Sequence, residues 1–183
     1  RRPLVKLLQR STQLFLLSFL NLCFLIGLKI IKEIKMFQVV HKTKVAGHYL
    51  DLMKRFDRDL FEALAPKVGK IEIAKFTGSE TGDKVHIKFL SPIRTEWVSH
   101  IIDHGQNENK AYFIDKGVQL PFPLDAWEHH HVIEKISEEE SYIVDDMRFK
   151  GRNYFWSLIL YPTIYLGFLP RGKVYRSYFG TFH

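Results

Sequence analysis

The sequence has a single cysteine, Cys23, among its 183 residues. One cysteine excludes an internal disulfide framework and every zinc site that is built on cysteine ligands. Cys23 also lies inside an apolar run, where a thiol is typically buried and unreactive. The chain has no G-x-S-x-G elbow, no H-E-x-x-H pair and no Walker phosphate loop. These absences remove the common motif-based hydrolase, metalloprotease and nucleotide-binding classes.

The main body of the chain carries almost no net charge. The whole sequence has a formal net charge of +7. Seven basic residues and one acidic residue lie within residues 1–35, which leaves only +1 for residues 36–183. A domain that binds DNA or RNA normally presents a basic patch. We therefore expect no nucleic-acid partner.

Residues 1–35 form a separate segment with an apolar centre. The 15 residues from Leu14 to Leu28 carry no charge. As a helix they would span about 22 Å, short of the roughly 30 Å hydrocarbon core of a bilayer. Basic residues precede the run as in a signal sequence, but no small-residue cleavage pattern follows it. Three interpretations stay open: an uncleaved membrane anchor, an amphipathic extension, or upstream sequence before a natural start at Met36.

In each interpretation the folded domain covers residues 36–183. We expect this domain in the cytoplasm, with membrane contact through residues 1–35 if they are an anchor. The composition supports one sizeable core, since 46% of all residues are apolar and 14% are aromatic. Such a content suits a domain that has large apolar surfaces to cover or a large apolar space to line.

Hydrophobic periodicity predicts a strand and then a helix at the start of the domain. Apolar and polar residues alternate over 37–45, as in a half-buried strand. Apolar residues then recur every four positions from Leu52 to Leu64, which predicts one amphipathic helix. Pro66 and Gly69 would end it.

From Gly69 onward the pattern predicts strands and tight turns. The expected strands cover residues 70–76, 84–90, 94–102, 110–118, 126–136 and 141–149. Regular turn signals between short strands indicate an antiparallel meander. Residues 153–170 are nearly all apolar and predict a long buried helix that is kinked or restarted at Pro162; a second membrane span is the weaker interpretation.

The predicted class is α+β, with a curved antiparallel sheet of about seven strands wrapped round a long C-terminal helix. A twisted sheet and a straight helix cannot pack fully along a curved surface, so an internal cavity is expected between them.

Three motifs resemble the SRPBCC superfamily, the START-like helix-grip proteins, in its bacterial ligand-binding members. They are a G-x-x-x-x-G-D hairpin (Gly78, Gly82, Asp83), a P-F-x-x-W-x-H-x-H-like strand with one extra residue between Phe122 and Trp127, and an aspartate strand (Asp145, Met147, Phe149). The resemblance covers about residues 36–179 and implies the helix-grip fold. It does not select a function, because the superfamily includes lipid carriers, hormone receptors, cyclases and oxygenase domains.

Three consecutive histidines follow Trp127 in the predicted strand 126–136. Side chains alternate between the faces of a strand, so His129 and His131 share a face with Trp127 while His130 points the other way. The three imidazoles therefore do not converge on one ion. A zinc site would need His129, His131 and a third ligand from a neighbouring strand. We expect no metal and no cofactor.

Asp145 is the best candidate for a partner of these histidines. If the acidic turn occupies residues 137–141, Asp145 faces the same side as His129 and His131; a four-residue turn would bring Asp146 inward instead. The first register is preferred because it buries the apolar residues on either side of Asp145. The two histidines are then half-buried wall residues that bond to Asp145 or water. Ligand orientation and a metal or general-base role are the alternatives.

The predicted function is binding of a small hydrophobic molecule, such as a lipid, an isoprenoid or a polyketide-like compound, in the cavity. The candidate ligand-binding residues are Phe89, Trp97, Phe113, Trp127, His129, His131, Asp145, Phe149, Trp156 and Leu160. Of the last helix, Trp156, Leu160 and Ile164 would form a lid. No residue is assigned a catalytic role.

Two other functions stay open. A cyclase- or hydrolase-like enzyme acting on such a molecule would use His129, His131 and Asp145, and it would show a carboxylate and an imidazole in hydrogen-bond contact facing the cavity. A membrane-tethered interaction domain without a ligand would show a solidly packed gap between sheet and helix. The ligand's identity and the oligomeric state stay open as well.

Overall fold

The computed structural model describes residues 36–65 and 69–181. The expectations for residues 1–35, and the helix end expected at Pro66, lie outside these residues. The elements are β1 (Phe37–Ala46), α2 (Tyr49–Lys54), α3 (Arg58–Leu64), β2 (Lys70–Phe76), β3 (Lys84–Ser91), β4 (Thr95–Gln106), β5 (Lys110–Gln119), β6 (Leu124–Lys135), β7 (Glu140–Gly151), α4 (Tyr154–Phe168) and α5 (Arg171–Phe179). The predicted α+β class is confirmed.

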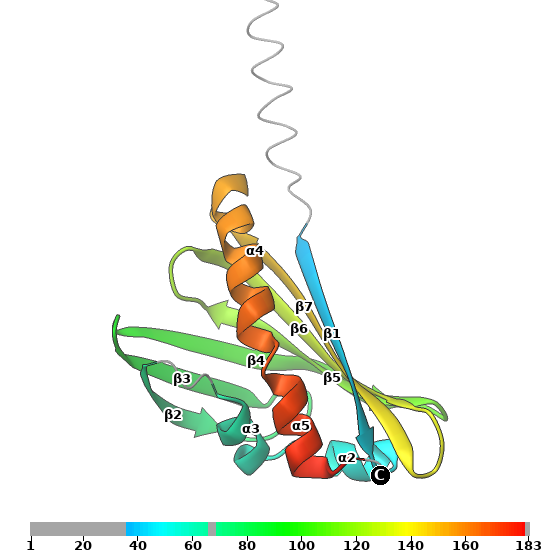
Figure 1. The fold of residues 1–183 in the computed structure, drawn as a ribbon. Helices are drawn as coiled ribbons and strands as arrows, with labels where there is room; N and C mark the ends of the chain where they lie inside the picture. Colours follow the sequence, from blue (N-terminus) through cyan, green and yellow to red (C-terminus); the bar gives the residue numbers. More distant parts are fainter. Residues whose placement is uncertain (1–35, 66–68, 182–183) are drawn as a thin grey trace, which may run out of the picture. The chain divides into compact units, whose positions relative to one another are not determined.

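The seven strands form one antiparallel sheet in the order β1-β7-β6-β5-β4-β3-β2. Strands β2 to β7 make the predicted meander, and β1 joins it beside β7. Figure 1 shows the sheet curling behind α4 and α5, which follow one another across one face. Burial alternates residue by residue along β6 and β7. One face of the sheet therefore forms the core while the other meets solvent.

The β2–β3 hairpin shows why its turn contains the G-x-x-x-x-G-D pattern. The Asp83 carboxylate accepts hydrogen bonds from the Thr77 hydroxyl (2.7 Å) and from the Glu80 amide (2.8 Å). Gly78 has a φ of +144°, and a Cβ at this position would come 2.4 Å from Asp83 Oδ2. Glycine is therefore required where the aspartate folds back over the turn.

The prediction of a single helix after β1 is wrong, because the segment contains two short helices. Asp57 has an extended backbone, and its carboxylate accepts a hydrogen bond of 3.0 Å from the Leu60 amide, so it caps the start of α3. The cap interrupts the helix between α2 and α3. The periodicity still identified the buried residues, which are Leu52, Phe56, Leu60 and Leu64.

The C-terminal helical region does not restart at Pro162, which was one of the two outcomes predicted for this residue. Helix α4 runs through Pro162, and the new helix α5 begins after Pro170, at Arg171. Helix α5 reaches into the core with Tyr175, which is buried.

The expectation that residues 153–170 are buried is also wrong. Ser157 is the one buried residue of α4, and a half-buried stripe faces the sheet, formed by Trp156, Leu160, Ile164 and Phe168. The other apolar side chains of α4 are exposed because only one side of this uniformly apolar helix meets the sheet. Within the described residues, no helix combines the length and apolar character needed to cross a membrane.

Two apolar clusters make up the core. One joins the sheet to α2, α3 and α5 and includes Ile133 and Tyr175. The other joins the sheet to α4 and includes Trp127 and Phe149. Residues 129–131 of β6 lie between Trp127 of one cluster and Ile133 of the other, so the histidines occupy the junction of the two clusters.

Candidate ligand-binding site

Strand β6 presents its three histidines in the predicted alternation. His129 and His131 are 2% and 8% exposed on the core face, which makes them buried where half-buried was expected. His130 lies on the outer face, where its Nε2 is 2.6 Å from Glu128 Oε1. The predicted separation of His130 from its neighbours is confirmed.

Strand β7 places Asp145 directly opposite His131. Lys135 pairs with Ser141, so the turn comes one residue earlier than predicted. The number of residues between Lys135 and Ser141 is odd, as in the predicted turn. Asp145 therefore faces the core, with an exposure of 1%. The register preferred on the grounds of apolar burial is therefore confirmed.

One oxygen atom, Asp145 Oδ1, has four polar neighbours. They are His129 Nε2 at 2.9 Å, the Tyr175 hydroxyl at 3.2 Å, Arg171 Nη1 at 3.5 Å and His131 Nδ1 at 3.6 Å. Burial alone would raise the pKa of this carboxyl. The hydrogen bond from His129 and the charge of Arg171 outweigh burial and hold the pKa of Asp145 well below its usual range. Asp145 is therefore an anion that fastens both β6 and α5.

His131 is held mainly by aromatic contacts. Its ring stacks on Phe113, with centroids 4.3 Å apart and an angle of 14° between the planes. Its Nδ1 is buried and has no hydrogen-bond partner. Burial, together with the nearby His129, lowers the pKa of His131 well below its ordinary value of 6.5, and Asp145 only partly opposes this. His131 is therefore a neutral imidazole at neutral pH.

Two further polar residues belong to this group and were not predicted. Asp115 of β5 pairs with His129, and its carboxylate accepts a hydrogen bond of 3.0 Å from the Trp127 indole. Burial raises the pKa of the Asp115 carboxyl. Strand alternation contained a signal for Asp115, which shares a face with Phe113. Arg171 of α5 had no such signal, because its position depends on how α5 packs.

A cavity of about 140 Å³ lies between the sheet, α3 and the junction of α4 with α5. Its lining residues are Phe61, Ala65, Ile71, Val85, Ile87, Phe89, Trp97, Ser99, Asp115, Trp127, His129, His131, Phe168 and Arg171. A smaller hollow of about 30 Å³ shares Asp115, His131 and Arg171 with it and extends to Phe113. The gap between sheet and helices is not solidly packed, so the feature expected of a ligand-free interaction domain is missing.

Six of the ten predicted site residues border these spaces. Phe89, Trp97, Trp127, His129 and His131 line the larger cavity, and Phe113 lines the smaller hollow. These six residues come from β3, β4, β5 and β6.

The other four predicted residues lie elsewhere in the core or at its edge. Asp145 contacts the two histidines without lining the cavity. Phe149 packs against Phe37 (centroids 5.9 Å apart), and Trp156 against Phe122 (5.1 Å). Leu160 packs on the Trp127 cluster, as does Ile164 of the expected lid.

The C-terminal helices contribute Phe168 and Arg171 to the cavity wall. The Arg171 guanidinium lies over the Phe168 ring, 4.1 Å from its centroid. Phe168 comes about two helical turns after Leu160, the centre of the lid predicted from the sequence, and Arg171 is the first residue of the next helix.

Comparison with solved structures identifies the architecture. Norcoclaurine synthase from Thalictrum flavum, in complex with dopamine and hydroxybenzaldehyde, superposes with a TM-score of 0.57 at 15% identity, over 83% of this chain and 94% of that one. The major latex-like protein 151 of Panax ginseng gives 0.54 at 12% identity, over 75% and 93%. The Zhui aromatase/cyclase from Streptomyces sp. R1128 gives 0.50 at 12% identity, over 77% and 94%.

The chain has the helix-grip fold. The fold implied by the resemblance to SRPBCC proteins is thereby confirmed. No protein-family model and no curated protein matches the sequence. These neighbours are a synthase, an aromatase/cyclase and a latex-like protein, so the shared fold does not decide the function, which has to be argued from the site.

Proposed function

We propose that the domain binds a small hydrophobic molecule in the 140 Å³ cavity. The observation that carries this proposal is the composition of the wall, where apolar and aromatic side chains surround a few convergent polar groups. This combination is typical of small-molecule sites, in which the apolar wall supplies affinity and the polar groups fix orientation. Asp115, His129, His131 and Arg171 are the polar groups.

The volume limits the size of the ligand. A cavity of about 150 Å³ accommodates a benzene-sized molecule. A single aromatic ring or a short alkyl group therefore fits the cavity as it stands, and the norcoclaurine synthase structure holds two single-ring compounds. A whole lipid, isoprenoid or polyketide would require Phe61 of α3 or Phe168 of α4 to move outward.

The proposal is tested by filling the cavity. Ile87 of β3 lines the cavity, and Lys88 lies next to it on the opposite face of the strand. Native mass spectrometry of the full chain would detect a co-purified ligand, and calorimetric titration with hydroxybenzaldehyde would measure affinity for a single-ring probe. We expect Ile87→Trp to weaken binding at least tenfold and Lys88→Trp to leave it unchanged. No bound molecule and no titratable probe, or equal losses in the two variants, would contradict the proposal.

A second candidate function, catalysis, is favoured by the contact between His129 and Asp145. It is a carboxylate–imidazole hydrogen bond whose imidazole borders the cavity, as expected of a cyclase- or hydrolase-like enzyme. With Nε2 held by Asp145, Nδ1 of His129 is left to accept a proton from a bound molecule. Hydrolysis of a p-nitrophenyl ester that is lost in His129→Ala but kept in His130→Ala would support this function. Equal rates in both variants would count against it.

We further propose that the domain works against a membrane, with residues 1–35 as its anchor. The support comes from α4, which has no charged residue. Exposed apolar side chains on α4 and at its C-cap are Tyr154, Phe155, Leu158, Ile159, Tyr161, Tyr165, Leu166 and Leu169. Phe37, at the start of the domain, contacts the rings of Tyr154 (5.8 Å) and Tyr161 (6.3 Å). Phe37 therefore lies beside this surface, whose mixture of tyrosine and leucine suits a membrane interface.

A further inference from the structure

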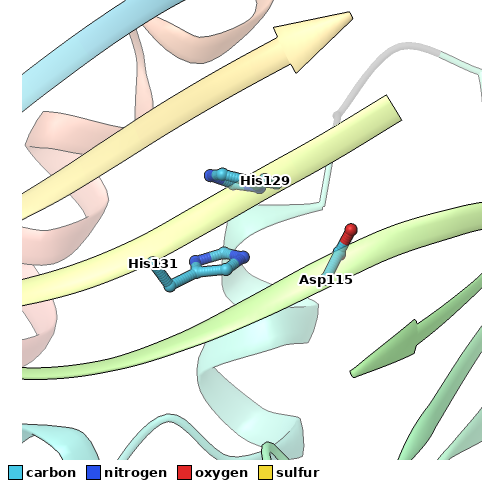
Figure 2. A group of neighbouring side chains, drawn as sticks. All are labelled: Asp115, His129 and His131. Carbon is cyan, nitrogen blue, oxygen red and sulfur yellow. The ribbon is translucent and has the colours of Figure 1, made fainter. Parts of the chain in front are cut away.

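Asp115, His129 and His131 bring three metal-ligating groups together on neighbouring strands. One carboxylate oxygen and one nitrogen from each imidazole lie within 4.8 Å of one another. Figure 2 shows the two imidazoles of β6 beside the Asp115 carboxylate of β5. Strand pairing fixes this arrangement, because Asp115 is directly opposite His129 and His131 follows two positions later on the same face.

A second observation also points to a ligand at this place. His131 Nδ1 is buried and has no hydrogen-bond partner, since Asp145 Oδ1 is 3.6 Å away. Buried polar atoms are nearly always paired, so an unpaired imidazole nitrogen calls for an explanation. A bound cation is one such explanation, and it also accounts for the two ligand groups beside His131.

His129 is held as metal-binding histidines usually are. Its Nε2 lies 2.9 Å from Asp145 Oδ1. Such a carboxylate fixes the ring and leaves the other nitrogen to bind the ion. The sequence suggested Asp145 of β7 as the third ligand. In the structure Asp145 supports His129 instead, and Asp115 of β5, on the other side of β6, supplies the ligand oxygen.

The local charges permit a divalent cation. Asp115 forms no ion pair among the described residues, so its carboxylate is available to a cation. Asp145 adds a second negative charge, and Arg171 provides the one guanidinium that borders the cavity. Before any ion is bound, these three groups leave one negative charge if both carboxylates are ionised.

We propose that Asp115, His129 and His131 form a binding site for a divalent transition metal of the zinc type. Two imidazoles and one carboxylate are the ligand set of open zinc sites, in which the fourth position is left to water or substrate. Here the fourth position faces the cavity. A tetrahedral site with bonds of about 2.1 Å needs donor atoms about 3.4 Å apart, so the three side chains draw together when the ion binds. This proposal replaces the expectation, drawn from the sequence, that no metal is bound.

The test measures metal binding directly and is independent of any organic ligand. Full-length protein without a histidine tag is stripped with a chelator and titrated with Zn²⁺ in a calorimeter, and separately with Co²⁺, whose visible spectrum reports tetrahedral coordination. We expect one equivalent to bind. His131→Ala and the isosteric Asp115→Asn should each weaken binding more than about 100-fold, beyond the 10- to 100-fold effect typical of a supporting group.

The matched control is His130→Ala, which removes the adjacent imidazole on the outer face and should leave the affinity unchanged. Circular dichroism confirms that each variant is folded. If His131→Ala does not fold, Asp115→Asn still decides the test. The proposal is overturned if no saturable equivalent binds, or if His130→Ala weakens binding as much as Asp115→Asn does.

Discussion

Tyr175 of α5 donates a hydrogen bond of 3.2 Å to Asp145 of β7, and both side chains are 1% exposed. The bond links the last helix to β7, the second strand of the sheet. Because the acceptor is a buried anion, this single hydroxyl contributes more to the free energy of unfolding than an ordinary surface contact does.

Replacing Tyr175 by Phe removes only this hydroxyl. We expect the free energy of unfolding to fall by about 1.5–3 kcal/mol, the usual value for a hydrogen bond to a charged group. The matched control is Tyr178→Phe, because the Tyr178 hydroxyl donates to Asp57 over 3.3 Å at the surface. It should cost less than about 0.5 kcal/mol. Urea unfolding of both variants measures the difference, and equal losses would show that burial of Asp145 is not decisive.

Stability should fall on mild acidification because of His131. Its folded-state pKa lies well below 6.5, so below about pH 6.5 the unfolded chain binds a proton that the folded chain excludes, and the free energy of unfolding decreases. Asp145, with its lowered pKa, adds to the loss below about pH 4. Asp115, with its raised pKa, acts in the opposite direction.

Urea unfolding between pH 7.5 and pH 5 isolates the contribution of His131, with a chelator present to remove metal. The dependence on pH should be shallower in His131→Gln and unchanged in His130→Gln. A wild-type stability that stays constant or rises towards pH 5 would contradict the neutral state of His131.

Trp127 should be important for both stability and ligand choice. It is 5% exposed, its ring meets Trp97 edge-on at 5.0 Å, and it borders the cavity. Trp127→Ala should cost about 3 kcal/mol, the lower end of the range for buried tryptophan, since its cavity side has fewer contacts to lose. The enlarged cavity should then prefer bulkier probes. His130→Ala should change neither quantity by more than about 0.5 kcal/mol.

These effects can be followed by urea unfolding and by tryptophan fluorescence during titration with hydrophobic probes. Trp97 and Trp156 also contribute to the signal. If His130→Ala lost probe binding while Trp127→Ala kept it, the assignment of the cavity would be wrong.

The exposed side of α4 should bind lipid vesicles. Phe155 and Leu166 are 62% and 61% exposed, so the double variant Phe155→Ser, Leu166→Ser should fold normally and sediment with anionic vesicles at least several-fold less than the wild type. The control is Ile93→Ser, Val118→Ser, which removes exposed aliphatic side chains from other parts of the chain. Equal sedimentation of the two variants would reject α4 as the membrane contact.

A version of the protein that begins at Met36 should fold as well as the full chain. The two apolar clusters that form the described core draw on residues from Phe37 onward. Circular dichroism and urea unfolding of both versions provide the comparison. Aggregation of the shorter version, while the full chain stays soluble, would place residues 1–35 within the folding unit.

Strand patterns predicted much of this molecule because side-chain alternation is a local property. The side chains of β6 that face the core followed from alternation, and the inward direction of Asp145 followed from alternation together with the burial of the apolar residues on either side of it. The helix break before Asp57 was missed because the four-residue spacing of buried side chains continues across it. Burial of α4 was overestimated, since an apolar sequence does not reveal how many of its sides meet other residues. Arg171 reaches the site through tertiary packing, which no local pattern encodes.

Arg171 and Tyr175 of α5 both contact one oxygen of Asp145. These contacts hold α5 on the sheet, and the end of α4 makes no contact with that oxygen. Arg171 and Tyr175 are four positions apart, so a shift of α5 by one turn along the sheet would exchange one partner for the other and break the buried ion pair. Phe168, which precedes both, contacts the Arg171 guanidinium with its ring, while the hydrogen bond from Tyr175 to Asp145 does not involve it. Substitutions of Phe168 at the end of α4 would therefore reshape the cavity while Tyr175 still holds α5 against the sheet.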